Sequence, residues 1–339
     1  MLGGGLVHGA TLRAVCDTDR ARADALAGQY HVEAFYGLPD LLRVNGIDAF
    51  TVLTPSGLHA RSVVELASSG RPIVVEKPMA LTLDDADRMI EACDGNRAKL
   101  FVVKQNRLNK PVQALRQAIE AGRFGKLVLG TVRVRWCRRQ DYYDQASWRG
   151  TWAFDGGVLA NQASHHLDLL EWMMGPVDSV FGLATTALVK IEAEDTAVVS
   201  LRFRNGALGV IEATTATRPK DLEGSLSILG ENGAVEIGGF AVDKLKTWQF
   251  QPQTEADARV FEESGNNPAH PAGYGHAQYY NHVVDCIQNN GQQLVDGLAG
   301  RRSLELITAI YESIETRREV ALRFWPERCR LGLRSPQAS

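Results

Sequence analysis

The chain has 339 residues, of which 45% are hydrophobic and 23% charged, and its net charge is −3. This composition is typical of globular proteins, and the length favours two domains over one core. The slightly acidic balance argues against a nucleic-acid or anionic-membrane partner, and we find neither a run long enough to span a membrane nor a secretory signal. The five cysteines lack zinc or CxxC spacing, so we expect reduced thiols in the cytoplasm and no metal site.

Short apolar runs alternate with amphipathic helical stretches in the first third of the chain. Thr82 precedes one of these stretches as a candidate N-cap, with Asp84 and Asp85 in the first helical turn. Alternating strands and crossover helices predict a parallel, doubly wound α/β sheet over residues 1–105. The predicted strands are 11–17, 48–54, 72–77 and 99–104, and the predicted helices are 19–30, 59–70 and 82–93.

After about residue 125 long strands follow one another, which predicts a second α/β domain over 106–325 with a large, open, mostly antiparallel sheet. Asn205-Gly206 and Asn232-Gly233 stand between strand runs and indicate hairpins. The polar segment 251–273 reads as a long surface loop, and 326–339 as a frayed tail. The predicted strands are 126–139, 195–218, 223–239 and 243–250, with helices at 109–121, 164–174, 274–289 and 301–317 expected to cover one face.

A dinucleotide-binding fold begins with a strand, a GxGxxG loop and a helix, and an acidic residue about 20 positions later binds the ribose. Asp17 has the right context for that acid, although such residues often only cap the next helix. Its charge favours NAD over NADP, while Arg20 and Arg22 keep NADP open. Gly3-Gly4-Gly5 has too few residues on either side to be the phosphate loop. We therefore expect the Gly-rich unit to be missing, through truncation or a misplaced start.

Glu76-Lys77-Pro78 follows a very apolar predicted strand. In an open α/β sheet ligands bind at the carboxyl ends of strands. A lysine there can hold a substrate hydroxyl and stabilise a developing alkoxide. The alternative is an ordinary surface lysine.

Three segments together resemble the glucose-fructose oxidoreductase/inositol dehydrogenase (Gfo/Idh/MocA) family. They are TPSGLHA (54–60), EKPMALTLDDADRMI (76–90) and GGVLANQASHHLDLLEWMMG (156–175), and the likeness extends over 11–324. The resemblance implies an NAD-dependent dehydrogenase that acts on an alcohol, with residues 1–105 as a Rossmann-like NAD-binding domain. It also implies a homodimer or homotetramer formed through the open sheet.

The resemblance also assigns roles to residues. Lys77 takes the place of the family's catalytic lysine, and His165 that of the acid/base histidine in a block that usually reads D-x-G-x-H. Asn161 replaces the usual Asp of that block and cannot stabilise an imidazolium by charge. The implied cofactor-binding residues are Asp17, Thr54, Pro55, Leu58, His59, Glu76, Lys77 and Gln105. The implied substrate-binding residues are Lys77, Asn106, Arg138, Tyr142, Arg149, Asn161, Gln162 and His165.

The residue types suit this chemistry. Oxidising a secondary alcohol requires a base for the O–H proton and an acceptor aligned with the C–H bond. A histidine titrates near neutrality, and a lysine cation lowers the pKa of a hydroxyl. Adjacent helical residues point about 100° apart, so only one of His165 and His166 can face a cleft. Asp168 would share the face of His165, although a solvated helix face is the plain alternative for His166 and Asp168.

A crowd of arginines and aromatic residues bears on the substrate. RWCRRQDYYDQASWRGTW (135–152) could hold a diphosphate, a carboxylate and a flat base, or could consist of solvated arginines and core aromatics. With KQNRLNKPVQALR (104–116) and GYGHAQYY (273–280), it is similar to the family branch that acts on UDP-N-acetylglucosamine uronate. The resemblance implies oxidation of the sugar C3 hydroxyl with NAD for surface-polysaccharide synthesis. Another sugar, an inositol, UDP-N-acetylglucosamine or a non-catalytic subunit without a cofactor loop remain alternatives.

Overall fold

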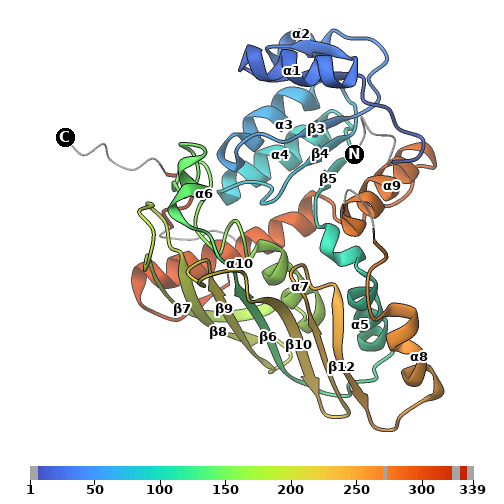
Figure 1. Ribbon diagram of the computed structural model, residues 1–339, viewed down its shortest axis with the longest axis vertical. Helices are drawn as coiled ribbons and strands as arrows, with labels where there is room; N and C mark the ends of the chain where they lie inside the picture. The colour runs from blue at the N-terminus through green and yellow to red at the C-terminus, as the bar shows by residue number, and fades with distance from the viewer. Residues whose placement is uncertain (1–6, 270–272, 323–328, 334–339) are drawn as a thin grey trace.

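Apolar strands and crossover helices in the first third of the chain fold as expected into a parallel α/β domain. The computed structural model describes residues 7–269, 273–322 and 329–333 (Figure 1). Three parallel strands form one sheet, β3 (Phe50–Val52), β4 (Ile73–Val75) and β5 (Leu100–Val102), while β1 (Ala14–Cys16) and β2 (Glu33–Phe35) form a separate parallel pair. The helices are α1 (Arg20–Tyr30), α2 (Leu38–Leu42), α3 (His59–Ala67) and α4 (Leu83–Gly95).

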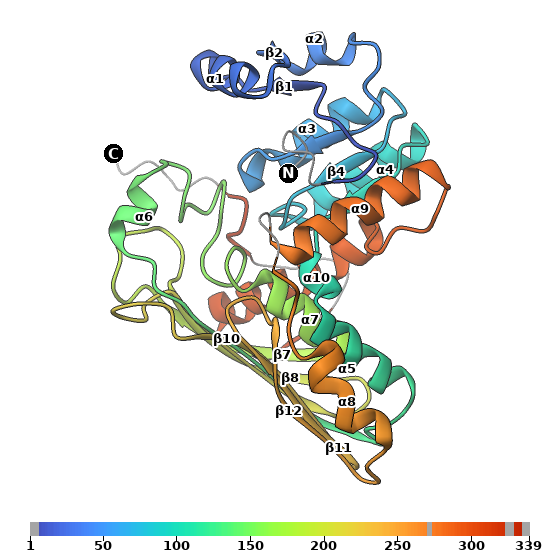
Figure 2. The same cartoon turned by 45° about the vertical axis from the view of Figure 1, so that its right-hand side comes forward.

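Two of these elements, β2 and α2, have no counterpart in the sequence prediction because both are short and lack a strong period. The Thr82 cap is confirmed, since its hydroxyl accepts a hydrogen bond from the Asp85 N–H at 3.1 Å. Within the described residues no strand joins β1 to β3, and Figure 2 shows the unit of β1, β2, α1 and α2 set apart from the β3–β5 sheet. The Gly3-Gly4-Gly5 triplet lies outside the described residues.

Alternate residues of the central strand β4 face two different hydrophobic clusters, so the sheet is buried on both sides. Ile73 and Val75 join the large cluster that includes α3 and α4, and Val74 joins a smaller one. The smaller cluster contains Tyr279 and Val283 of α9 (Tyr274–Gln288). The prediction that this helix covers the large second sheet is therefore wrong. Its Tyr and Val side chains complete the first domain instead.

The second domain is built on an eight-stranded sheet in the order β12-β11-β10-β6-β9-β8-β7-β13. Only the β6–β9 pair is parallel, which confirms a mostly antiparallel sheet. Both Asn-Gly dipeptides stand at hairpins, between β8 and β9 and between β10 and β11. The strands are β6 (Leu127–Arg135), β7 (Val177–Thr185), β8 (Thr196–Phe203), β9 (Leu208–Thr214), β10 (Glu223–Gly230), β11 (Gly233–Gly238), β12 (Lys244–Phe250) and β13 (Val320–Ala321).

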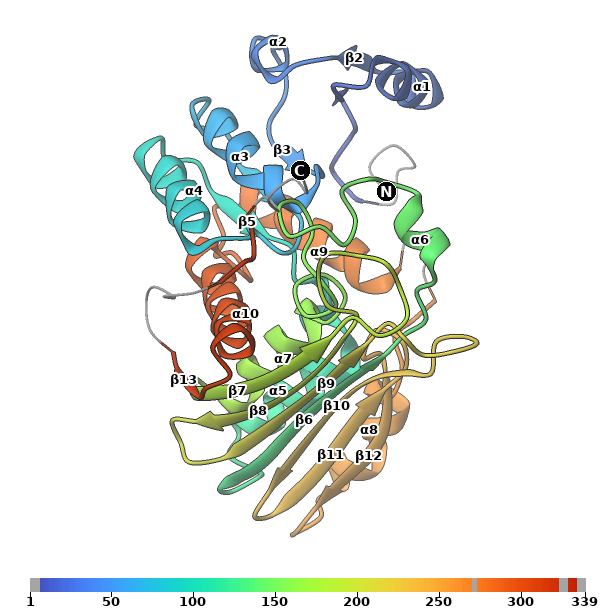
Figure 3. The same cartoon turned by 90° about the vertical axis from the view of Figure 1, so that its left-hand side faces the viewer.

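Among the described residues, helices cover one face of this sheet and none covers the other, as Figure 2 shows with the sheet seen nearly edge-on. The covering helices are α5 (Lys110–Glu120), α7 (Ser164–Met174), α8 (Glu255–Ser264) and α10 (Gly297–Thr316). The long helix α10 also packs against α4 and β5, so it joins the two domains (Figure 3). No helix in the described part of the chain is long and apolar enough to cross a membrane.

The segment predicted as a surface loop over 251–273 contains the helix α8, so that prediction is wrong. Thr254 and Asp257 form a capping box, in which the Thr254 N–H and hydroxyl both donate to Asp257 Oδ2. Val260 is the buried apolar residue of this helix, and most of the remainder is polar. One apolar anchor is too weak a period to identify a helix from sequence, because packing rather than propensity stabilises most helices.

Candidate active site

Lys77 stands just beyond the carboxyl end of β4, where the two domains meet. Its Nζ donates to the backbone oxygen of Asn161 at 2.9 Å and to Asn161 Oδ1 at 3.0 Å. An ammonium has three N–H donors, so within the described residues one remains for a hydroxyl. Burial lowers the pKa of Lys77, while the carboxylates of Glu76 and Asp155 raise it. The interpretation as an ordinary surface lysine is excluded.

Asn161 is itself held by a carboxylate that the sequence prediction did not include. Its Nδ2 donates to Asp155 Oδ1 at 2.5 Å, and the other oxygen of Asp155 accepts from the Gly150 N–H at 2.8 Å. Asp155 is only 1% exposed. Burial raises its pKa to about 6, against the lowering effects of the Gly150 N–H and the Lys77 charge.

His165 lies near Lys77 and faces the segment that follows β5. Its Nε2 is 3.1 Å from Nε2 of Gln105 in the short helix η3 (Gln105–Leu108). His165 Nδ1 and Gln105 Oε1 are buried and have no hydrogen-bond partner in the described structure. Burial, and then the positive charges of Lys77 and Lys104, hold the pKa of His165 well below its usual range. The imidazole is therefore neutral at neutral pH, the form that can accept a proton.

The neighbouring histidine points elsewhere, as helix geometry requires. The ring of His166 packs edge-on against Trp136, with ring centroids 5.7 Å apart. Neither ring nitrogen of His166 has a partner in the described structure, and burial lowers its pKa to about 4. A solvated helix face is wrong for this residue, since α7 is buried along most of its length.

Asp168 is also buried, as the anchor of an ion-pair network. Arg107 donates to both of its carboxylate oxygens at 2.8 Å, and the Ser303 hydroxyl donates to Oδ1 at 2.6 Å. Lys104 Nζ lies 3.7 Å from Oδ1. Burial would raise the pKa of Asp168, but the charges of Arg107 and Lys104 outweigh it and hold that pKa well below its usual range. This network fixes η3, and so Gln105, against α7.

The residues predicted to bind the cofactor lie along the carboxyl ends of the parallel strands. Asp17 directly follows β1 and pairs with Arg22, whose Nη1 lies 3.1 Å from Oδ2. Thr54, Pro55 and Leu58 follow β3 around the short helix η2 (Ser56–Leu58). Glu76 lies partly buried beside Lys77.

His59 differs from this group because both of its ring nitrogens are engaged within the protein. Nδ1 is 2.9 Å from the Pro78 carbonyl oxygen and Nε2 is 2.8 Å from that of Thr54. Burial lowers the pKa of His59, against the raising effect of these carbonyls. The ring thus ties the loop after β3 to the loop after β4, and any contribution to cofactor binding is through loop position.

The polar atoms of the site that have no hydrogen-bond partner in the described structure indicate whether NAD fits these residues. Lys77 has a spare donor, and the buried unpartnered atoms Gln105 Oε1 and His165 Nδ1 lie in the same cluster. A buried polar atom without a partner is costly unless a ligand or water satisfies it. The cluster therefore fits a nicotinamide and a hydroxylated substrate between the two domains.

The Arg and aromatic segment divides into two groups. Arg138 and Arg149 both flank Tyr142 of α6 (Gln140–Asp144), with guanidinium carbons 5.5 and 4.2 Å from its ring centroid. Arg149 Nε is buried without a partner in the described residues. Arg135 instead forms ion pairs with Glu212 and Glu223 on the sheet. Arg138 and Arg149 thus lie together around Tyr142, although Arg138 also pairs with Asp221 at 3.1 Å, whereas Arg135 is held on the sheet.

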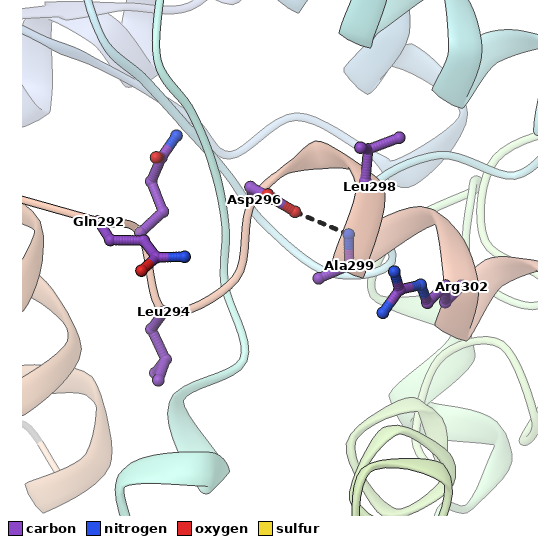
Figure 4. Close-up of a pocket in the computed structure, with 7 residues that line it drawn as sticks. Gln292, Leu294, Asp296, Leu298, Ala299 and Arg302 are labelled. Carbon is purple, nitrogen blue, oxygen red and sulfur yellow. Dashed lines mark hydrogen bonds between the residues drawn. The ribbon is translucent and has the colours of Figure 1, made fainter. Parts of the chain in front are cut away.

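Two further predicted residues, Asn106 in η3 and Gln162 just before α7, are buried. In the sequence they directly follow Gln105 and Asn161. A pocket near the start of α10 has none of the predicted site residues in its lining (Figure 4). It is lined by Gln292, Gln293, Leu294, Asp296, Leu298, Ala299 and Arg302. The described residues contain no group of three or more His, Cys, Asp or Glu side chains that could hold a metal ion.

Sequence reasoning missed Asp155, Lys104 and His276. Asp155 directly precedes the Gly156-Gly157 pair of the recognised block, and Lys104 begins the KQNR stretch, so both had a weak local signal. His276 lies in α9, where burial lowers its pKa and the charges of Glu76 and Lys77 act on it. His276 lies close enough to Glu76 and Lys77 for this effect because α9 packs against the first domain.

Comparison with known proteins agrees with this geometry. Residues 6–104 match the model of an oxidoreductase family with an NAD-binding Rossmann fold, and residues 116–322 match that family's C-terminal alpha/beta domain. The WlbA dehydrogenase from Bordetella pertussis, crystallised with NADH and UDP-GlcNAcA, is 43% identical with a TM-score of 0.89, and the match covers 94% of this chain and 93% of that one.

Two more relatives extend the comparison. The WlbA dehydrogenase from Chromobacterium violaceum, also crystallised with NADH and UDP-GlcNAcA, is 41% identical with a TM-score of 0.86, over 92% of this chain and 88% of that one. The D-apiose dehydrogenase of Rhizobium rhizogenes is 26% identical over 93% of this chain and 91% of its own length. The chain belongs to the Gfo/Idh/MocA family of NAD-dependent oxidoreductases, as a dehydrogenase that acts on a sugar hydroxyl.

Proposed function

We propose that this protein oxidises the C3 hydroxyl of UDP-N-acetylglucosaminuronate (UDP-GlcNAcA) to a ketone, with NAD⁺ as hydride acceptor. The observation that carries the proposal is the cluster of Lys77, Asn161 and His165 between the domains, in a chain 43% identical to a dehydrogenase crystallised with NADH and UDP-GlcNAcA. We further propose that the reaction takes place in the cytoplasm and serves the synthesis of a surface-polysaccharide sugar.

In this proposal the two catalytic residues divide the work on the substrate hydroxyl. The remaining N–H donor of Lys77 holds the oxygen, and its positive charge stabilises the alkoxide character that develops there. His165, neutral because burial and nearby cations lower its pKa, accepts the hydroxyl proton. When bound, NAD⁺ would supply the acceptor for the hydride from the carbon that carries this hydroxyl.

In this proposal the remaining site residues bind NAD and the nucleotide sugar. Asp17 would accept from the adenosine ribose, and Thr54, Pro55, Leu58, Glu76 and Gln105 would line the nicotinamide half of NAD, with His59 holding their loop. Asn106, Asn161 and Gln162 would position the sugar. Arg138 and Arg149, with Tyr142 between them, would receive the diphosphate or the uronate carboxylate, since guanidinium groups match both bidentately.

We also propose that two copies of the chain associate through the free face of the large sheet. Cross-strand neighbours on this face expose apolar side chains: Leu183 pairs with Val198, and Phe181 and Val210 both pair with Ser200. A contiguous exposed apolar patch commonly marks an interface. The occupant that fits a flat apolar sheet face is the same face of a second copy, which gives a closed two-fold contact.

A substrate panel tests the proposed reaction. NADH formation would be followed with UDP-GlcNAcA, with UDP-N-acetylglucosamine, which has no carboxylate, and with D-apiose as a free sugar. We expect kcat/KM to be highest for UDP-GlcNAcA and at least about a hundredfold lower for the other two, because each lacks an anionic group that the partly buried arginines would bind. Preferential turnover of D-apiose would replace the proposed substrate with a free sugar.

Lys77→Met tests the role assigned to the lysine. The variant keeps a side chain of similar length but loses the charge and its donors, so we expect kcat to fall about a hundredfold or more while the protein stays folded. The matched control is Lys126→Met, which changes an exposed lysine directly before β6 and should keep wild-type rates. Unchanged kcat in Lys77→Met would remove this residue from the mechanism.

A further inference from the structure

The family block that usually carries an aspartate has a neutral Asn161 here. The contact between Lys77 and the Asn161 side-chain amide therefore places no negative charge next to the lysine. The structure contains a carboxylate directly behind this amide. Asp155 Oδ1 accepts from Asn161 Nδ2 at 2.5 Å, and Asn161 Oδ1 accepts from Lys77 Nζ at 3.0 Å. The three groups form a continuous chain of hydrogen bonds from a buried carboxylate to the catalytic ammonium.

The two ends of this chain fix the orientation of the amide between them. A carboxylate accepts only and an ammonium donates only, so the Asn161 NH₂ must face Asp155 and its oxygen must face Lys77. If the amide rotated by half a turn, NH₂ would meet ammonium and oxygen would meet carboxylate. Successive hydrogen bonds also polarise one another, which makes the amide oxygen a stronger acceptor.

Asp155 itself forms no ion pair with an arginine or lysine among the described residues, although it is 1% exposed. Its contacts are the Gly150 N–H at 2.8 Å and Asn161, so its charge is not neutralised locally. Lys77 and Arg149 act on it from further away. A buried carboxylate without a direct counter-ion is costly, and here its field falls on Lys77.

We propose that Asp155 is a positioning residue that acts through Asn161 to orient Lys77 and keep it cationic, in place of the acidic residue that the chain lacks at position 161. This inference rests on the catalytic role proposed for Lys77, but it is independent of which sugar is oxidised. Burial alone favours the neutral amine, which cannot stabilise an alkoxide, and the Asp155 charge opposes that loss.

The same carboxylate links the lysine to the arginine cluster. Gly150, whose N–H donates to Asp155, directly follows Arg149, and its carbonyl accepts from the N–H groups of Glu192 and Ala193 at 3.1 Å. The turn that carries Arg149 is therefore anchored at the residue that orients Lys77. The position of the substrate-binding arginine and that of the catalytic lysine depend on one buried group.

Asp155→Asn is the direct test, because it keeps the shape and an oxygen for the Gly150 N–H but removes the charge. The primary readout needs no substrate: the Cε resonance of Lys77 in lysine-labelled protein, assigned with Lys77→Arg, gives the pKa of Lys77. We expect this pKa to fall by about one pH unit or more. Because the cation is the active form, activity is lost as pH rises through this pKa, so the alkaline limb of kcat/KM should move to lower pH by the same amount.

Two further variants separate charge from shape. The exchange Asp155→Asn with Asn161→Asp returns one carboxylate to the chain of hydrogen bonds and should restore most of the Lys77 pKa and of the activity. Asp178→Asn, at an exposed position on β7, should change neither. An unchanged Lys77 pKa in Asp155→Asn, or an exchange variant no better than Asp155→Asn, would overturn the inference. Absence of turnover with UDP-GlcNAcA in wild type would refute the proposed substrate alone, since the resonance still reports on Lys77.

Discussion

At the scale of single residues, the site depends on buried charges of opposite sign. Lys77 and Lys104 are cations whose pKa burial lowers, and Asp155 and Asp168 are the carboxylates that oppose this effect. Asp168 is bound bidentately by Arg107 and is 2% exposed. Removing one member of a buried ion pair leaves an uncompensated charge, which is more costly than the pair is stabilising.

Asp168→Asn should therefore lower the free energy of unfolding by about 3–5 kcal/mol. Urea denaturation followed by circular dichroism would measure it, with Asp178→Asn as the exposed control. A loss below about 1 kcal/mol, the range of exposed ion pairs, would show that the network is not holding η3 against α7.

The same residue predicts a pH dependence of stability. Its folded-state pKa lies well below its usual range of about 4, so the carboxylate contributes stability above that value and loses it as pH falls toward the folded pKa. Wild type should lose stability on acidification below about pH 4, and Asp168→Asn should lose less over the same range. Parallel curves for the two proteins would contradict this assignment.

At the scale of elements, the loop after β3, which is proposed to bind the cofactor, contacts the segment before Asp155 through the backbone of Gly57. The Gly57 N–H of η2 donates to the Phe154 carbonyl at 3.1 Å, one residue before Asp155. A Cβ added to Gly57 would lie 2.0 Å from the Ala153 carbonyl oxygen, so no other residue fits without moving a loop. This close approach fixes the distance between the loop after β3 and the segment that carries Asp155.

Gly57→Ala should separate these loops and lower kcat/KM for NAD⁺ about tenfold or more, since small displacements of reacting groups are costly. Gly28→Ala is the matched control, because a Cβ there meets nothing within 4 Å. In helix α1 that change should add up to about 1 kcal/mol of stability. Wild-type kinetics in Gly57→Ala would mean that the loops adjust freely.

Most elements with a strong local period could be predicted from sequence, although the strand β7 was missed despite its alternating pattern. The Thr82-capped helix and the two Asn-Gly hairpins were found because cap and turn residues act locally. The helix α8 was missed because it has one apolar anchor. The placement of α9 was wrong because its Tyr279 and Val283 could face either sheet, and only the tertiary structure decides between them.

The candidate site shows the same limit. Lys77 and His165 were predicted because the block spacing is specific, and the structure places Lys77 against Asn161 and His165 against Gln105. Asp155 was missed because its connection to Lys77 runs through a side-chain amide, which no spacing rule encodes. Arg135 could not be separated from Arg138 by sequence, since only strand register puts it opposite Glu212 and Glu223.

At the scale of the whole molecule, the second sheet is covered on one face and exposes apolar side chains on the other. If the free face joins two copies, the double change Leu183→Glu and Val198→Glu should convert the protein to a monomer, because like charges would face each other across the contact. Light scattering after size exclusion would give the mass. Leu222→Glu, at a 66% exposed leucine outside the patch, should leave the mass unchanged. A wild-type monomer, or an unchanged mass in the double variant, would contradict the proposed interface.

In the proposed reaction a hydride leaves the C3 carbon of UDP-GlcNAcA for NAD⁺ while Lys77 and His165 act on the C3 hydroxyl. It is tested most directly with UDP-GlcNAcA that carries deuterium at C3, followed by mass spectrometry of the reduced cofactor. The account predicts one deuterium on the nicotinamide ring with wild-type protein and almost no labelled product with Lys77→Met. Reduced cofactor without deuterium, or no reduced cofactor at all, would contradict it.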